Sequence, residues 1–359
     1  MKKVLFASTA LVATAGVAAA DVALSGSAEM GVFGGDMYNT TTDMFESMET
    51  QFHTDIDVTF TLSGESDGGI TFGAAVDLDE NAAFTPENNG GIAIFISGDF
   101  GTLTMGDTDG ALDWALTEAA VGNAGSIQDN ETGHVGYVGS YLDGAYDGQI
   151  LRYDYSFGDF AFAASVEMDD DGDRDNGYAI GAMYNGSFAG GSYGVGIGYQ
   201  VATPRDDWML GNINGTMFSD LTGGAADGFG DAIDDVTALG VSANVALDSG
   251  FSFGVTYTQY EAEGDSAPLG VVGTSFDTTH VGVGAGYTFD AITVSANYGM
   301  IEIDNLGEFT GYGVAAAYDL GGGLSAHLGY GSSDYDYDGV AGSADATVNT
   351  WSFGLAMSF

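Results

Sequence analysis

The chain has 359 residues, and its 52 Asp and Glu residues outnumber its 5 Lys and Arg residues, which gives a formal net charge of −47. So acidic a chain excludes nucleic acid as a partner, because binding to phosphates requires Lys and Arg. The 59 Gly residues, the 3 Pro residues and the 12% aromatic content favour many short strands over disorder, because disordered acidic chains are poor in aromatic residues.

Residues 1–20 have the pattern of a secretory signal peptide. Lys2 and Lys3 supply its charged start, an apolar stretch follows, and the small residues at 18–20 form a cleavage site. We therefore expect the exported chain to begin at Asp21. Since the sequence has no Cys, we expect neither a lipoprotein anchor nor disulfides, and the fold alone must stabilise the exported protein.

Alternation of apolar and polar residues is the main structural pattern. In the segment 55–62, apolar residues at even positions alternate with polar residues at odd positions, and the same period of two recurs in 70–79, 160–168 and 292–298. The polar face is built largely from Gly, Ala, Ser and Thr, which are too small to fill the core of a soluble sandwich. No stretch after the leader has the roughly 18 apolar residues of a transmembrane helix. We therefore predict a membrane barrel with an apolar exterior and a polar lumen.

Sixteen segments have the character of strands, and an even number is expected of a single-chain bacterial barrel. They are 22–34, 50–64, 69–79, 90–99, 101–108, 148–157, 159–168, 176–186, 191–202, 236–247, 251–261, 277–289, 291–303, 308–319, 323–333 and 346–359. Seven short turns alternate with eight external loops, so both chain ends lie on the periplasmic side. The external loops are near 35–49, 80–89, 109–147, 169–175, 203–235, 262–276 and 334–345, with one shorter exception at 304–307.

The last predicted strand alternates apolar residues up to a terminal phenylalanine. Trp351, Phe353 and Phe359 share one face of this strand. We expect the barrel-assembly machinery of the outer membrane to recognise them as an assembly signal. A hydrophobic last strand without that role is the alternative.

Several short motifs resemble the porins of Rhodobacter-type alphaproteobacteria. They are DVALSGSAEMGVF at 21–33, GTLTMGD at 101–107, AYDLGGG at 317–323 and the terminal Phe359. The resemblance implies an all-β fold for residues 21–359, a sixteen-stranded antiparallel transmembrane β-barrel whose long third external loop folds into the lumen. It also implies a homotrimer in the bacterial outer membrane, surrounded by lipids and lipopolysaccharide, that lets ions and small hydrophilic solutes diffuse. In that family an acidic inner loop faces basic residues on the barrel wall.

The segment 109–147 is the counterpart of that constriction loop, and it contains no Lys or Arg. We expect its acidic residues to line the pore: Asp109, Asp113, Glu118, Asp129 and Glu131, followed by Asp143 and Asp147. A short helix is expected within 111–120, with Leu112 and Trp114 packed on the wall. A solvated external loop, whose acidic residues only keep it soluble, is the alternative.

The predicted wall departs from the family pattern. The period of two directs a largely acidic set into the lumen, where the family would show Arg or Lys: Glu29, His53, Asp55, Asp57, Asp77 and Glu167. Arg152 is the only basic residue predicted on an inward strand face. One carboxylate about 7 Å from a cation contributes roughly 0.6 kcal/mol in water, and five approach about 3 kcal/mol. Screening at physiological salt removes about half, which predicts a cation preference of about tenfold.

An external segment has the spacing of a calcium loop. Asp334, Asp336, Asp338 and Asp345 stand at its first, third, fifth and twelfth positions. Ca²⁺ is the ion that this spacing predicts, and we expect the protein to require no cofactor. An acidic loop tip without a specific ion is the alternative.

Catalysis finds little support, because the four histidines are scattered and no Ser or Asp stands at a recognised nucleophile spacing. We therefore expect no enzyme, although a barrel-borne outer-membrane enzyme stays open as an alternative. A soluble secreted calcium-binding β-roll is another, suggested by GGAADGFGD at 223–231. That fold requires tandem repeats of this unit, which occurs once.

Overall fold

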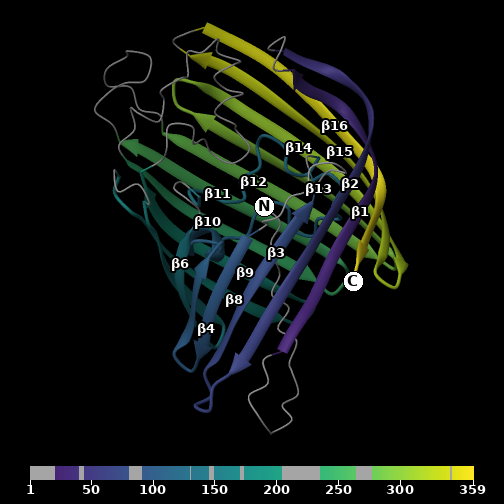
Figure 1. Cartoon of the computed structure of the whole chain (residues 1–359). Coiled ribbons are helices and arrows are strands. Elements are labelled where there is room, and N and C mark those ends of the chain that lie inside the picture. Colours follow the sequence, from purple (N-terminus) through teal and green to yellow (C-terminus); the bar gives the residue numbers. More distant parts are fainter. Residues whose placement is uncertain are drawn as a thin grey trace.

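The computed structural model describes residues 21–39, 44–80, 91–129, 131–144, 149–169, 174–203, 235–263, 277–339 and 342–359. They form sixteen antiparallel strands and one short helix in a closed barrel (Figure 1). Each strand pairs with its neighbours in the chain, and β1 pairs with β16 to close the sheet. The predicted fold class is confirmed, and a β-roll is excluded. The expected signal peptide at 1–20 lies outside the described residues.

The strands agree in number and order with the prediction. Their bounds are β1 Asp21–Asn39, β2 Met44–Glu65, β3 Thr71–Glu80, β4 Gly91–Gly98, β5 Gly101–Gly106, β6 Ile150–Phe157, β7 Phe160–Glu167, β8 Gly177–Phe188, β9 Gly191–Ala202, β10 Asp235–Leu247, β11 Phe251–Glu263, β12 Thr278–Phe289, β13 Ile292–Ile303, β14 Gly307–Gly321, β15 Leu324–Gly339 and β16 Gly342–Ser358. In the described part of the chain, no helix has the length and apolar character needed to cross a membrane.

Two hairpins are longer than predicted. The segments 35–49 and 334–345, predicted as loops, are mostly strand, because β1–β2 and β15–β16 extend toward their shared tips. In β15 the alternation continues but is inverted, because Asp334 and Asp336 take the outward parity of Leu328, whereas Tyr337 faces inward and is buried. In β1–β2 polar residues stand at adjacent positions, such as Glu46 and Ser47, so the alternation of apolar and polar residues that marks a strand within the bilayer is absent. The predicted loop bounds were therefore wrong at these two positions.

Large apolar side chains cover the outside of the barrel. Val22, Leu24, Ile94, Ile197 and Leu328 are each more than half exposed, at 66, 65, 57, 52 and 54%. Burial of one such side chain is worth about 1.5–3 kcal/mol, so a soluble protein would not leave this whole surface in water. The exterior therefore suits the hydrocarbon interior of a membrane.

Aromatic rings form a belt around the turn ends of β6 to β9, β11 and β12. Neighbouring rings stack or tilt against one another, as in Phe160 with Tyr184 at 4.6 Å between centroids and Phe251 with Tyr287 at 4.1 Å. Phe157, Phe188, Tyr193, Phe253 and Phe289 continue the belt. Aromatic girdles of this kind mark the level at which a barrel crosses a membrane–water interface.

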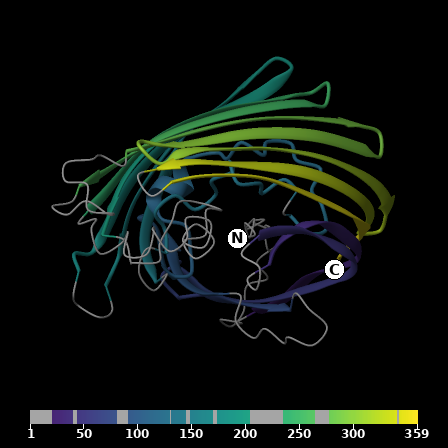
Figure 2. The same cartoon turned by 90° about the horizontal axis from the view of Figure 1, so that it is seen from above.

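The chain that follows β5 turns into the ring of strands (Figure 2). It begins with α1, Ala111–Ala115, which packs against β7, β8 and β9. The helix is shorter than the predicted segment 111–120, because Leu116 is extended, with φ −94° and ψ 153°. The next backbone N–H, of Thr117, donates to Ser242 Oγ on β10 at 2.8 Å. A hydrogen bond to the wall thus takes the place of the next helical turn.

The inside-out arrangement predicts opposite effects of a charge on the two faces of one strand. On β2, Phe60 faces outward and is 38% exposed, whereas the adjacent Thr61 faces inward. We expect Phe60→Arg to lower the free energy of unfolding in lipid vesicles by about 2–4 kcal/mol if it lies near the bilayer midplane. The matched control Thr61→Arg should cost much less, and equal losses in denaturant titrations would contradict the assigned faces.

Candidate functional site

Carboxylates gather on the inner faces of β1, β2 and β3. Glu29 lies directly opposite Asp55, and Asp57 lies directly opposite Asp79. His53 Nε2 lies 3.8 Å from Glu29 Oε2. This part of the wall is therefore acidic, and like charges in directly opposed positions repel each other.

Hydroxyl groups hold two carboxylates of this wall in place. Ser27 Oγ donates to Asp57 Oδ2, and Thr59 Oγ1 donates to Asp77 Oδ1, each at 2.9 Å. The strand register thus places Asp57 and Asp77 on the inner face, where the sequence predicted them.

Arg152 lies on the inner face of β6 and is engaged by the start of the inner loop. Its Nη1 donates to the carbonyl oxygen of Asp109 at 2.6 Å, and its Nε donates to Asp154 Oδ1 at 3.4 Å. The guanidinium carbon also lies 5.9 Å from the centre of the Trp114 ring. Within the described residues, Arg174 is the only other Lys or Arg. Arg152 therefore fastens the loop and offers little unpaired positive charge.

Four inward-facing serines hold the inner loop, which we define as residues 109–144, against the wall. Backbone N–H groups of the loop donate to a serine Oγ on β7, β10, β13 and β15 at 2.8–3.0 Å. The pairs are Ala111 with Ser165, Thr117 with Ser242, Ala124 with Ser295, and Val135 with Ser333. The loop thus receives partners for backbone groups that would otherwise be buried without a hydrogen bond.

Inward-facing glycines let the loop backbone lie directly on the strands. A Cβ at Gly284 on β12 would overlap with the carbonyl oxygen of Ala119, and one at Gly313 on β14 would overlap with that of Glu131. Further close approaches of the same kind occur at Gly181, Gly196, Gly286, Gly299 and Gly331. In the middle of the loop sequence, at the point farthest along the wall from α1, Ile127 touches Gly31 on β1. The loop therefore follows the inner wall from β7 to β1.

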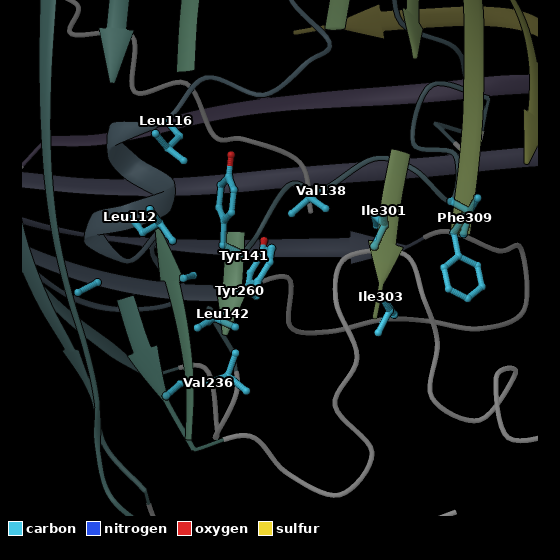
Figure 3. Packing of buried hydrophobic residues seen from close by; sticks show 14 of the residues in the cluster. Leu112, Leu116, Val138, Tyr141, Leu142, Val236, Tyr260, Ile301, Ile303 and Phe309 are labelled. Carbon is cyan, nitrogen blue, oxygen red and sulfur yellow. The ribbon is translucent and has the colours of Figure 1, made fainter. Parts of the chain in front are cut away.

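Apolar side chains seal part of the contact between loop and wall (Figure 3). Tyr141 and Leu142 of the loop lie beside Tyr260 of β11, and all three are at most 2% exposed. Tyr141 Oη and Thr256 Oγ1 lie 3.4 Å apart. Burial is the main reason that the pKa of Tyr141 is raised, so this hydroxyl stays protonated. The predicted packing of Leu112 on the wall is also present, because its side chain is fully buried.

Asp143 joins the two ends of the loop. Its carboxylate accepts hydrogen bonds from the Gly110 backbone N–H at 2.6 Å and from Gln200 Nε2 at 2.7 Å. Burial raises the pKa of Asp143 to about 7 against these two bonds, and the charges of Glu167 and Asp109 act in the same direction as burial. Because this pKa lies above the ordinary 3.8, the contribution of Asp143 to loop docking is full below pH 3.8 and is lost as the pH rises to about 7.

His134 gives the opposite dependence on pH. Its imidazole is 2% exposed, and burial, with a smaller contribution from His280, lowers its pKa to about 4. The neutral ring is therefore favoured in the docked loop. Its contribution is full above the ordinary pKa of 6.5 and is lost as the pH falls to about 4. Between about pH 4 and pH 6.5, a rising pH therefore weakens the contribution of Asp143 to loop docking and strengthens the contribution of His134.

The loop acids are not equivalent. Asp109 and Asp129 are exposed, and Glu118 is half-buried and accepts a hydrogen bond from the Tyr137 hydroxyl. Asp113 and Glu131, only 5% and 0% exposed, lie under the loop, so their predicted place on the pore surface is wrong.

Local contacts explain the burial of these acids. Ser126 Oγ donates to Glu131 Oε2 at 2.6 Å, and Asp113 lies on the short helix that packs against the wall. Glu167 of the wall is likewise covered, because it is 5% exposed and accepts from the Gly144 N–H at 3.2 Å. The predicted Asp147 lies outside the described residues.

The predicted calcium loop has a different geometry. Asp334, Asp336 and Asp338 lie on β15, and Asp336 pairs with Asp345 across the hairpin. Alternate residues of a strand are about 6.6 Å apart along an extended backbone, so the backbone from Asp334 to Asp338 does not wrap around one ion as in a calcium loop. The loop conformation is therefore wrong, and metal binding by these acids stays a prediction.

The residues of the expected assembly signal occupy the outer face at the chain end. Phe353 is 54% exposed on β16, and Trp351 shares its outward parity and packs over Gly34. Phe359 is 81% exposed, and its N–H donates to the Gly26 carbonyl at 2.9 Å. Recognition of this end by assembly machinery stays a prediction.

Sequence reasoning missed the docking residues of the inner wall. The glycines do carry a pattern, since GVGIG at 194–198 and GVGAG at 282–286 repeat Gly at the inward positions of β9 and β12. Such repetition indicates a surface that another backbone approaches closely. The serines and Gln200 give no comparable sequence pattern.

A methyl group on the glycine surface should displace the loop. We expect Gly284→Ala to speed amide hydrogen exchange across residues 110–143, because the added Cβ overlaps with the Ala119 carbonyl. The matched control Gly68→Ala lies in the turn between β2 and β3, where the atom nearest to an added Cβ is 3.9 Å away. Unchanged exchange in Gly284→Ala would contradict docking through this glycine.

The carboxyl group of Asp143 should titrate at an unusual pH. We expect its ¹³C resonance to shift with a midpoint of about 7, rather than the ordinary 3.8, because the group is buried at the base of the loop. Asp143→Asn identifies the resonance by removing it. A midpoint near 4 would show that the carboxyl group is solvated and that the contact of Asp143 with Gly110 and Gln200 is not closed in solution.

Comparison with known proteins agrees with this architecture. Residues 7–356 match the family model described as Gram-negative porin. A curated porin of Rhodobacter capsulatus is 30% identical over 318 residues, which are 88% of this chain and 95% of that protein. A porin structure refined at 1.8 Å covers 94% of this chain and all of its own, with a TM-score of 0.66 and 24% identity. A mutant Rhodopseudomonas blastica porin gives 0.57 and 18% over the same shares of the two chains. The chain therefore belongs to the Gram-negative porin family and is a β-barrel of the bacterial outer membrane.

Proposed function

We propose that the chain forms a water-filled channel that prefers cations and lets ions and small hydrophilic solutes diffuse passively. The observation that carries this proposal is the run of inward carboxylates on β1, β2 and β3, with Glu29 opposite Asp55 and Asp57 opposite Asp79. Arg152, the basic residue of the inner wall, is engaged by Asp154 and by the loop backbone. Family membership points to a channel rather than to an enzyme.

The position of the loop supports its role as a constriction. It follows the inner faces from β7 onward, and Ile127 brings it to Gly31 on β1. Glu29 stands two residues before Gly31 on the same strand and faces the same way. An ion that passes the loop here therefore meets the acidic wall.

The magnitude of the preference follows from simple electrostatics. Each carboxylate about 7 Å from a permeating cation contributes roughly 0.6 kcal/mol in water. The five carboxylates of β1, β2 and β3 would give about 3 kcal/mol, halved at physiological salt, so a cation preference of about tenfold is expected. They are Glu29, Asp55, Asp57, Asp77 and Asp79. The exposed Asp109 and Asp129 of the loop act in the same direction.

The outer surface suggests where copies of the chain meet in the expected homotrimer. The aromatic belt covers β6 to β9, β11 and β12, whereas Val22, Leu24, Leu328 and Leu355 make the corresponding outer face of β1, β15 and β16 mainly aliphatic, with Phe353 and Phe359 among its aromatic residues. A girdle is needed only where the barrel meets lipid and lipopolysaccharide. We infer that the aliphatic sector is the contact between copies.

Recognition of Trp351, Phe353 and Phe359 during assembly completes the proposal. These residues lie on or just beyond the last strand, where a partner can reach the free chain end.

Calcium bound outside the barrel by Asp334, Asp336, Asp338 and Asp345 would link neighbouring strands of one hairpin. The channel requires no cofactor.

Ion selectivity tests the proposal directly. In a planar bilayer under a KCl gradient, we expect a reversal potential that corresponds to roughly tenfold cation preference. Replacing Glu29, Asp57 and Asp77 together by Gln, Asn and Asn should reduce this preference severalfold, because three charges leave the wall. The control Asp67→Asn removes one charge from a periplasmic turn and should have little effect. A zero or anion-selective potential in the unmodified protein would refute the proposal.

A further inference from the structure

The acidic wall contains one nitrogen ligand among its carboxylates. Donor atoms of Glu29, His53 and Asp55, one from each residue, all lie within 4.8 Å of one another. Asp55, Asp57 and Asp79 form a second group with the same spacing, so the two groups share Asp55. Glu29 and Asp55 are also direct cross-strand partners, an arrangement of like charges that a bound cation would stabilise.

His53 provides an observation independent of the acidic composition. Its side chain is only 10% exposed, and Nε2 is shielded from solvent and has no hydrogen-bond partner among the described residues. The 3.8 Å to Glu29 Oε2 is too long for a hydrogen bond. A buried polar nitrogen is costly to leave without a partner, and this one is directed at a carboxylate group. Bonding to a metal would satisfy it.

The ring of His53 also packs against an aromatic neighbour. Phe33 on β1 packs edge-on against it, with centroids 6.1 Å apart and an interplanar angle of 86°. Asp55 is 6% exposed and belongs to the same strand as His53, two residues away, so both side chains face inward. Such prior ordering lowers the entropy cost of binding an ion.

We propose that Glu29, His53 and Asp55 bind one divalent transition-metal ion, of which Zn²⁺ is the test case. Imidazole nitrogen with carboxylate oxygen is a ligand set that suits Zn²⁺ and its first-row neighbours, whereas Ca²⁺ and Mg²⁺ prefer oxygen alone. The open coordination positions would be filled by water from the lumen. Asp57 and Asp79 attract cations to the site without being required as ligands.

The site lies beside the part of the inner loop that reaches β1. His53 is the cross-strand partner of Gly31, and Gly31 is the residue that Ile127 of the loop touches. If the proposed channel function holds, a bound divalent ion would place two positive charges beside the constriction. Zinc would then reduce both the cation current and the cation preference.

Binding is measured first, because it does not depend on channel function. The folded, detergent-solubilised protein is titrated with ZnCl₂ by calorimetry in about 1 M KCl, where a Debye length of about 3 Å suppresses loose binding to acidic loops. We expect one tight site per chain. His53→Gln, and separately Glu29→Gln, should each weaken this site at least about tenfold, since even the loss of a supporting partner costs about 10–100-fold in affinity.

The matched control is His327→Gln. His327 also faces the lumen, but its Nε2 lies 2.7 Å from Ser325 Oγ and its Nδ1 lies 3.0 Å from the Gly125 carbonyl oxygen, so both nitrogens are engaged. This variant should retain the tight site. Wild-type Zn²⁺ affinity in both His53→Gln and Glu29→Gln would overturn the proposal. So would Ca²⁺ that binds as tightly as Zn²⁺ and is indifferent to His53.

Bilayer recordings then separate the two proposals. If Zn²⁺ binds in a His53-dependent manner to a protein that conducts no ions, only the channel function fails. If the protein conducts and prefers cations but binds no Zn²⁺, only the metal site fails. With both correct, micromolar Zn²⁺ lowers the current of the unmodified channel and a chelator restores it, whereas His53→Gln responds only at concentrations at least about tenfold higher.

Discussion

In the interior of a membrane, every backbone N–H and C=O group must find its partner within the protein, and a sheet meets this condition only when it has no free edge. Pairing of β1 with β16, from Ser27 with Ser358 to Gly35 with Thr350, removes that edge. Closure also gives each strand one inner and one outer face. The apolar exterior, the aromatic belt and the carboxylate wall are all consequences of which face a residue takes, and thus of whether its position is odd or even.

The same dependence explains what could be predicted from the sequence. The number, order and facing of the sixteen strands followed from the period of two, because lipid on one side and water on the other impose it. Where β1–β2 and β15–β16 continue beyond that environment, acidic residues such as Asp334 and Asp336 take outward positions, and the strands were predicted as loops. The pattern reports the surroundings of a strand rather than its hydrogen bonds, so it fails where lipid no longer covers the outer face.

The inner loop was harder to predict for a different reason. Its length and acidic residues were visible, but its path is set by backbone N–H groups that donate to serines such as Ser242 and Ser295, and by glycines that leave room for carbonyl groups. These contacts depend little on the identity of the loop side chains. Asp113 and Glu131 consequently looked equivalent to Asp109 and Asp129 in the sequence, although only the latter pair is exposed. The inward direction of Glu29, Asp55 and Asp57, by contrast, followed from strand parity alone.

The path of the loop has a consequence for how the protein folds. The loop joins β5 to β6, yet it bonds to residues as distant as Ser295 and Ser333, which are 171 and 198 positions away from their partners. These contacts cannot form until the C-terminal strands are in place, and Ile127 reaches Gly31 and Gly354 on the very strands that close the sheet. Contacts between such distant residues form slowly, because a long stretch of chain must be ordered before they stabilise it. Docking of the loop and closure of the barrel should therefore be late, coupled events. In a chain truncated before β16, Ile127 of the loop would lose its contact with Gly354.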